Sequence, residues 1–230
     1  VHGHMLVTIN SRKRLFEHEL RQRFGVSIET PKARRQAWWH YQLMDHAFLR
    51  TWWWNLEEFA PGAWRANQPS PRQIERYAER GIRTILNLRG DGRYSHYLFE
   101  EEACARHGIT LVSLTFSARR LSPRADMLEL IDTMRRIEKP FLIHCKSGSD
   151  RTGLAAALYL AVIEGRPVRE ARRQLHWRFL HLSSTDTGVL DHVFDAYEAD
   201  TAETPMPLLE WLETRYDHEA LKASWDATRR

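Results

Sequence analysis

Cysteine and arginine stand six positions apart in the segment from His144 to Gly153, which reads HCKSGSDRTG. Small residues lie between them, so the backbone N–H groups of this segment can approach an anion closely. Such N–H groups together with a guanidinium bind the oxygens of a phosphoryl group. Cys145 as a thiolate would attack phosphorus in line and form a phosphocysteine, while Arg151 would hold two phosphoryl oxygens.

The other polar residues of the segment have expected roles around that reaction. Five are expected to bind phosphate: Lys146, Ser147, Gly148, Ser149 and Thr152. The hydroxyl of Thr152 or Ser147 can donate a hydrogen bond to the sulfur and help it leave in the second step. We expect His144 to order the loop through hydrogen bonds rather than to act as an acid.

The sequence on either side of the segment predicts the elements that position it. An apolar run at 140–143 precedes it and a second apolar run at 154–160 follows, which indicates a buried strand, a tight loop and a buried helix. That order aims the positive end of a helix dipole at Cys145. A free thiol has a pKa of about 8.5, and helix N-termini and cationic neighbours lower it.

Strands and helices alternate along the middle of the chain. This pattern predicts an α/β fold with a mainly parallel central sheet and helices on both faces. In such sheets ligands bind at the carboxyl ends of the strands, where the loops 89–93, 115–123 and 145–151 would lie. The expected strands are 63–66, 83–88, 109–114 and 140–143, and the expected helices are 71–80, 95–107, 123–138 and 154–164.

Helical extensions are expected at both ends of this domain. The sequence divides into a basic, Trp-rich N-terminal arm at 1–59, the α/β domain at 60–200 and a C-terminal extension at 201–230. Within the arm we expect helices at 11–24 and from about 31 to 54. After residue 164 we expect helices at 167–180, 186–199, 205–214 and 217–226.

Composition narrows the class of protein. The net charge of +4, from 34 basic and 30 acidic residues, permits an anionic substrate and does not favour nucleic acid. Two cysteines form no disulfide framework, and we place Cys104 in the core. Since no run of 18 apolar residues and no secretory hydrophobic region is found, we expect a cytoplasmic protein. Nothing in the sequence calls for a metal or another cofactor.

The arm is crowded with aromatic residues interleaved with arginine and histidine. Two interpretations follow. In the first, the aromatic side chains pack on the main domain. In the second, residues 33–54 form an interfacial helix that rests on an anionic membrane with tryptophan at the headgroup level, which would place the protein at the inner membrane surface.

The HCx5RTG pattern resembles the signature of the cysteine-dependent protein tyrosine and dual-specificity phosphatases. The resemblance covers roughly residues 60–200 and implies a phosphatase domain with Cys145 as the nucleophile and Arg151 as the phosphate clamp. The stretches ANQPSPRQIERYAERGIRTILNLRG and TDTGVLDHVFDAY also resemble a bacterial subgroup of dual-specificity-like phosphatases. That subgroup is associated with cell-envelope polysaccharide or lipopolysaccharide.

One part of the family pattern is missing. The family's general acid is an aspartate on a loop about 30 residues before the cysteine, but residues 113–123 contain no Asp or Glu. Asp150 is the first replacement, because similar loops of lipid and phosphoinositide phosphatases carry Asp at this position, where it is proposed as the acid. Asp91 is the second candidate. Alternatively, Asp150 is a structural carboxylate that pairs with an arginine lining the loop.

Basic residues around the loop favour a substrate with several anionic groups. Lys146, Arg119, Arg120 and Arg124 would make the mouth basic, unless the arginines are solvated or pair with acids at 100–102. Asp91 and Arg93 are further candidates for substrate binding. We therefore expect a phosphomonoesterase for lipid, phosphoinositide or glycolipid phosphates. The alternatives are a protein tyrosine or dual-specificity phosphatase, a catalytically weak phosphate-binding docking module, and a rhodanese-like sulfurtransferase.

Overall fold

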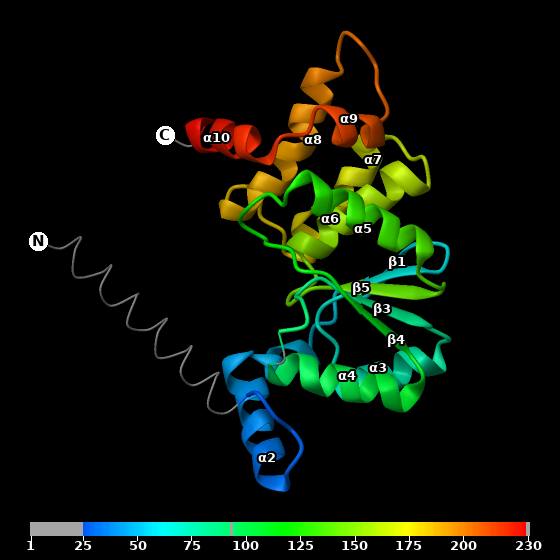
Figure 1. The fold of residues 1–230 in the computed structure, drawn as a ribbon, viewed down its shortest axis with the longest axis vertical. Helices are drawn as coiled ribbons and strands as arrows, with labels where there is room; N and C mark the ends of the chain where they lie inside the picture. The colour runs from blue at the N-terminus through cyan, green and yellow to red at the C-terminus, as the bar shows by residue number, and fades with distance from the viewer. Residues whose placement is uncertain (1–24, 93, 229–230) are drawn as a thin grey trace, which may run out of the picture.

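A five-stranded sheet forms the centre of the protein (Figure 1). The computed structural model describes residues 25–92 and 94–228. The strands lie in the order β1-β2-β5-β3-β4. Their bounds are Glu57–Ala60 for β1, Ala63–Ala66 for β2, Thr84–Asn87 for β3, Thr110–Ser113 for β4 and Phe141–His144 for β5. β2, β5, β3 and β4 are parallel, so the predicted α/β fold with a mainly parallel sheet is confirmed.

The edge strand β1 was not expected. It pairs antiparallel with β2 through a tight turn at Pro61 and Gly62, where Gly62 has a φ of +72°. Residues 57–59 belong to the predicted helical arm, so the predicted boundary between the arm and the α/β domain, between residues 59 and 60, falls inside β1. The four residues of β1 are too few to separate a strand from a helix turn by periodicity alone.

Helices cover both faces of the sheet, as Figure 1 shows. On one face lie α3 (Pro71–Glu79) and α4 (Ser95–His107), whose core includes Ile74, Tyr77 and the buried Cys104. On the other face lie α5 (Arg124–Arg136), α6 (Asp150–Leu158) and helices from the C-terminal part of the chain. The expected helices at 71–80, 95–107, 123–138 and 154–164 are therefore present, although the last begins at Asp150 and continues from Tyr159 to Ile163 as a π-helix.

The described part of the arm packs against α4. It contains α2 (Pro31–Trp39), a π-helix η1 (His40–Met44) and a 3₁₀-helix η2 (Ala47–Thr51). The expected continuous helix to residue 54 is wrong, because His46 adopts a left-handed conformation and breaks it. Ala37, Tyr41 and Ala47 share a small core with Phe99 of α4, which is the packing that the first interpretation of the arm predicted. The expected helix at 11–24 lies outside the described residues.

The C-terminal part is less regular than expected. Instead of one helix at 167–180 the chain forms α7 (Val168–Ala171), η4 (Arg172–Gln174) and η5 (Trp177–Phe179), because Leu175 and Leu180 leave helical geometry. After them come η6 (Asp186–Gly188), α8 (Val189–Asp200), α9 (Leu208–Thr214) and α10 (His218–Thr228). α8 and α9 add Val193, Phe194 and Trp211 to the core above α5 and α6.

Candidate active site

The loop of residues 145–149 joins the end of β5 to the start of α6, as the sequence predicted. Cys145 is only 1% exposed at the bottom of this loop, and the side chain of Thr152 is buried beside it. Gly148 has a φ of +74°, and a Cβ there would lie 2.6 Å from the carbonyl oxygen of Ala66. Only glycine therefore fits at this point of the loop.

The surroundings of Cys145 favour the thiolate. Burial opposes the charge, but the charge of Arg151 and hydrogen bonds from the Thr152 hydroxyl and from the backbone N–H groups of Thr152 and Gly148 outweigh it. The pKa of Cys145 is consequently lower than that of a free thiol. The hydroxyl of Thr152 is buried beside the sulfur, where it can take the role predicted for Thr152 or Ser147 in departure of the sulfur.

Arg151 is held in place by one of its terminal nitrogens. Nη1 donates to the carbonyl oxygens of Leu88 at 3.1 Å and Phe116 at 3.2 Å, which belong to the loops after β3 and β4. Its Nε is buried and has no hydrogen-bond partner within the described residues. An unpaired buried N–H of this kind is costly, and an oxyanion bound in the loop would satisfy it.

Arg65 on β2 is a supporting residue that the sequence analysis missed. Its side chain is completely buried, and Nη2 donates to the carbonyl oxygen of Gly148 at 2.6 Å. Nη1 donates to the carbonyl oxygen of Gln174 at 2.8 Å, and the guanidinium stacks 3.6 Å from the ring centroid of Phe179. Because Arg65 on β2 binds the carbonyl oxygen of Gly148, it helps to orient the N–H groups of the loop toward Cys145. Burial lowers the pKa of Arg65 to about 9, and the charge of Cys145 opposes this shift.

The two serines of the loop are tied to the scaffold. Ser149 is buried, and its hydroxyl donates to the carbonyl oxygen of Phe179 at 2.5 Å. The amide of Asn55 donates to the carbonyl oxygens of Ser147 and Phe179 at 3.0 and 2.9 Å. These contacts use the Ser149 side chain and the Ser147 carbonyl for loop rigidity, and the Ser149 N–H donates to Ser147 Oγ at 3.4 Å.

A buried polar network runs from the loop to the arm. His144 is completely buried and its Nε2 lies 2.6 Å from Glu100 Oε1. Glu100 accepts from Gln68 at 2.7 Å, and Gln68 accepts from Arg89 at 2.9 Å. Arg89 in turn binds Asp45 at 2.6 Å. His144 therefore orders the loop, as expected, and does so through residues of α4 and of the arm.

Asp150 pairs with a histidine rather than with an arginine. Its Oδ1 lies 2.8 Å from His181 Nδ1, and His181 Nε2 lies 2.6 Å from Asp191 on α8. Burial works against the imidazolium, but the hydrogen bonds and charges of Asp150 and Asp191 outweigh it and raise the pKa of His181 to about 9. The contact with His181 engages one oxygen of the Asp150 carboxylate, which weakens the case for Asp150 as the general acid.

We expect Asp150→Asn to lower kcat by similar factors for aryl phosphates with good and with poor leaving groups. The reason is that its carboxylate holds the start of α6 to His181 and so positions Arg151. Brønsted plots of wild type and variant check this, since loss of an acid slows poor leaving groups selectively, by up to about 10²–10⁴-fold. A selective loss would assign the acid to Asp150. Asp195→Asn on α8 is the matched control, because Asp195 lies on the same helix as Asp191 but pairs with Arg172 and not with His181.

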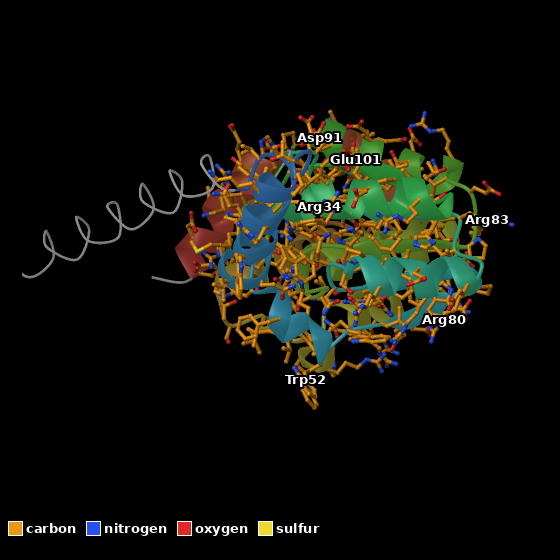
Figure 2. The ribbon with its side chains drawn as sticks, turned by 90° about the horizontal axis from the view of Figure 1, so that it is seen from below. Arg34, Trp52, Arg80, Arg83, Asp91 and Glu101 are labelled. Carbon is orange, nitrogen blue, oxygen red and sulfur yellow. The ribbon has the colours of Figure 1, made fainter. Side chains whose placement is uncertain are left out.

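The remaining predicted site residues lie around the mouth or outside the described part. Asp91 is exposed at the edge of the molecule (Figure 2). Arg119 and Arg120 are exposed on the loop before α5, and neither is paired with the acids at 100–102 in the structure. Arg124 donates to the carbonyl oxygen of Tyr216 at 2.7 Å, so its guanidinium is engaged by the segment after α9. Arg93 lies outside the described residues.

Of the supporting residues that the sequence did not predict, only Arg65 carried a recognisable sequence signal. A charged residue inside a buried strand, such as Arg65 in the run Ala63–Ala66, is rare and therefore informative. His181 and Asp45 stand in segments whose irregular backbone gave no periodic pattern.

Comparisons with known proteins agree on the family and the fold. The model of the family described as Swiss Army Knife protein, DSP-PTPase phosphatase domain (PTP-SAK) matches residues 63–193. Dual specificity protein phosphatase TpbA of Pseudomonas aeruginosa strain UCBPP-PA14 is 27% identical over 141 residues, 60% of this chain. That match spans only 57% of the length of TpbA.

Solved structures share the architecture at low sequence identity. The crystal structure of P. aeruginosa TpbA is 21% identical, with a TM-score of 0.51 and coverage of 74% of this chain and 90% of that one. The core catalytic domain of the PP-IP phosphatase SIW14 from S. cerevisiae, in complex with citrate, is 18% identical. Its TM-score is 0.50, and it covers 66% of this chain and 94% of that one. At these identities the likeness concerns the fold.

Proposed function

The chain belongs to the PTP-SAK family of dual-specificity-type protein tyrosine phosphatase domains, and on this premise we propose that it hydrolyses phosphomonoesters through a phosphocysteine on Cys145. The observation that carries this proposal is the pairing of a stabilised thiolate with a guanidinium whose Nε is buried and unpaired. Both groups lie in one loop at the start of α6, where backbone N–H groups and the helix dipole favour an anion.

The first chemical step transfers the phosphoryl group to sulfur. The thiolate of Cys145 attacks phosphorus in line, a P–S bond forms, and the bond between phosphorus and the ester oxygen breaks. Arg151 Nε and the loop N–H groups donate to the phosphoryl oxygens, whose charge they stabilise as the bonds change. The leaving oxygen takes a proton from a general acid or from water.

The second step releases phosphate. A water molecule attacks phosphorus, the P–S bond breaks, and the electron pair returns to sulfur as the Cys145 thiolate. Thr152 donates a hydrogen bond to that sulfur and so stabilises it as a leaving group. The proton lost by the water leaves with the product phosphate or through solvent.

As the substrate class we propose lipid, phosphoinositide or glycolipid phosphates. Support comes from the exposed cations near the mouth, Lys146, Arg119 and Arg120. TpbA is named a dual specificity protein phosphatase, which makes phosphoprotein the alternative substrate. For this chain we also propose the bacterial, envelope-related setting that the sequence resemblance suggested.

The surface of the arm supports contact with a membrane. Seven large apolar side chains in the described part of the arm are exposed: Val26, Trp38, Trp39, Leu43, Phe48, Leu49 and Trp52. Trp52 is 91% exposed and projects from the rest of the protein (Figure 2). Exposed tryptophans beside basic residues are typical of interfacial segments. No helix in the described part of the chain has the length and apolarity needed to cross a bilayer. We therefore propose peripheral contact at the inner membrane surface.

Substrate class and membrane contact can be tested together. We expect wild-type enzyme to turn over a short-chain phosphoinositide with a higher kcat/KM than a phosphotyrosine peptide. On vesicles that contain the same headgroup, Trp52→Ser should lose about tenfold in kcat/KM, since burial of an aromatic side chain contributes about 1.4 kcal/mol or more. The dispersed short-chain lipid is the internal control and should be unaffected. A preference for the peptide would contradict the lipid proposal, and equal loss on both lipid forms would contradict membrane contact.

A docking module is the second candidate function. It is favoured by the absence of Asp and Glu from residues 113–123 and by the pairing of Asp150 with His181. Such a module would bind inorganic phosphate or vanadate tightly and turn over none of the substrates above.

A further inference from the structure

A cavity lies beside the loop of Cys145, between the arm and the start of α4. Its volume is about 200 Å³. It is lined by His40, Met44 and Asp45 from the arm, by Arg89 and His96, and by Lys146 of the catalytic loop. Lys146 directly follows Cys145, so the cavity adjoins the site of phosphoryl transfer. Three of its seven lining residues, which also include Tyr94, come from before the family match, which begins at residue 63.

Positive charge exceeds negative charge around this cavity. Arg89 and Lys146 line it, and Arg50 lies behind Asp45. Asp45 is the carboxylate of the lining, and it is shared between Arg50 and Arg89 at 2.6 Å each, with Lys146 Nζ at 3.7 Å. Burial opposes this carboxylate, but Arg89 and Arg50 hold its pKa well below the usual range. The single carboxylate of Asp45 therefore lies close to three cations, those of Arg50, Arg89 and Lys146.

The two histidines that line the cavity do not change this excess of positive charge. Burial, together with the charge of Arg89, lowers the pKa of His96 to about 3, so that His96 is neutral at neutral pH. His40 Nδ1 lies 2.8 Å from the hydroxyl of Ser95. Beneath the cavity, Glu100 is engaged by Gln68 and His144. The charges that face the cavity are consequently those of Arg89, Lys146 and Asp45.

The N-terminal end of α4 adds to the attraction for an anion. The helix begins at Ser95 without a side-chain cap from Tyr94 and without an acidic residue in its first turn. The first turn therefore supplies no carboxylate that would neutralise the positive end of the α4 dipole. The cavity volume is below the range of about 300–1,000 Å³ that holds drug-sized ligands, so it suits one compact group.

We propose that this cavity binds a second phosphate of the substrate while the first is attacked by Cys145. The preferred substrate is then a bisphosphorylated molecule. The inference rests on the proposed function and adds that the arm selects substrate by charge. Arg89 and Lys146 donate to the second phosphate, and Asp45 keeps Arg89 extended toward the cavity when the site is empty.

The test compares substrates that differ by one phosphate on the same scaffold. Short-chain phosphatidylinositol mono- and bisphosphates are assayed with wild type, with Arg89→Gln and with Met44→Trp, which fills the cavity without changing charge. The wild type should prefer the bisphosphate by about tenfold or more in kcat/KM, as expected when one charged hydrogen-bonding group is added. Both variants should reduce that ratio to near one.

Controls separate this inference from the proposed function. Arg83→Gln removes an exposed arginine from the opposite end of β3 (Figure 2) and should keep the wild-type ratio. A wild type without preference, or variants that slow both substrates equally, would overturn the inference. If no substrate turns over, the proposed function fails. The inference is then judged by calorimetric titration of both lipids, where equal affinity of the wild type for the two would overturn it.

Discussion

Replacement of Cys145 by serine is expected to abolish turnover of aryl phosphates while binding of phosphate persists. An alkoxide at this position would need a far higher pH than the thiolate that the loop stabilises. Loss of a covalent nucleophile costs about 10⁴–10⁶-fold in kcat, because the remaining groups still bind and stabilise charge. Steady-state rates with a chromogenic aryl phosphate and a vanadate titration measure the two properties.

Cys104 supplies the matched control for that experiment. It is the other cysteine, buried on α4 in the core of the opposite sheet face, and burial raises the pKa of its thiol. Cys104→Ser should therefore keep kcat. In wild type, the rate should persist to lower pH than an ordinary thiol permits, since the pKa of Cys145 is lowered. Activity of Cys145→Ser near that of wild type would exclude the phosphocysteine mechanism.

The second large effect is expected for Arg151→Lys. A lysine ammonium is a single nitrogen. It cannot lie against the carbonyl oxygens of Leu88 and Phe116 and also against the phosphate, as the separate Nη1 and Nε of Arg151 do. We expect kcat/KM to fall by about 10²–10³-fold, the cost of losing one preorganised donor to a developing charge. Because the two carbonyl contacts also position the loops after β3 and β4, phosphate affinity should fall as well.

Arg172→Lys is the control for a general cost of losing a guanidinium. Arg172 binds Asp195 and Glu198 of α8 through its two terminal nitrogens. This variant should keep kcat/KM and change only thermal stability, by less than about 1 kcal/mol. If Arg172→Lys and Arg151→Lys lost activity equally, the proposed role of Arg151 would be wrong.

The sequence predicted those elements and site residues that depend on a pattern within a few neighbouring positions. Apolar runs on both sides of residues 144–153 predicted strand β5 and helix α6, and the spacing of Cys145 and Arg151 predicted their meeting in one loop. These elements are short-range features, in which periodicity and helix-start signals act over a few residues. The family comparison then confirmed the phosphatase class.

Contacts between distant segments could not be predicted in the same way. Asp150 meets His181, 31 positions away, and Arg89 meets Asp45, 44 positions away. No local pattern encodes such partners, because they depend on how α8 and the arm pack on the domain. The arm itself was misjudged near its end, where a left-handed His46 and the short strand β1 replace a continuous helix.

The network from His144 to Arg50 also constrains how this sequence can diverge. Arg50 and Asp45 are both nearly buried, and Arg89 is close to them. Loss of the aspartate alone would strand two buried cations, at a cost of about 3–5 kcal/mol, a large share of the 5–15 kcal/mol that stabilises a typical domain. Substitution of Asp45 is therefore expected to be tolerated only together with compensating changes at 50 and 89. The arm and the catalytic domain should accordingly be inherited together, as one evolutionary unit.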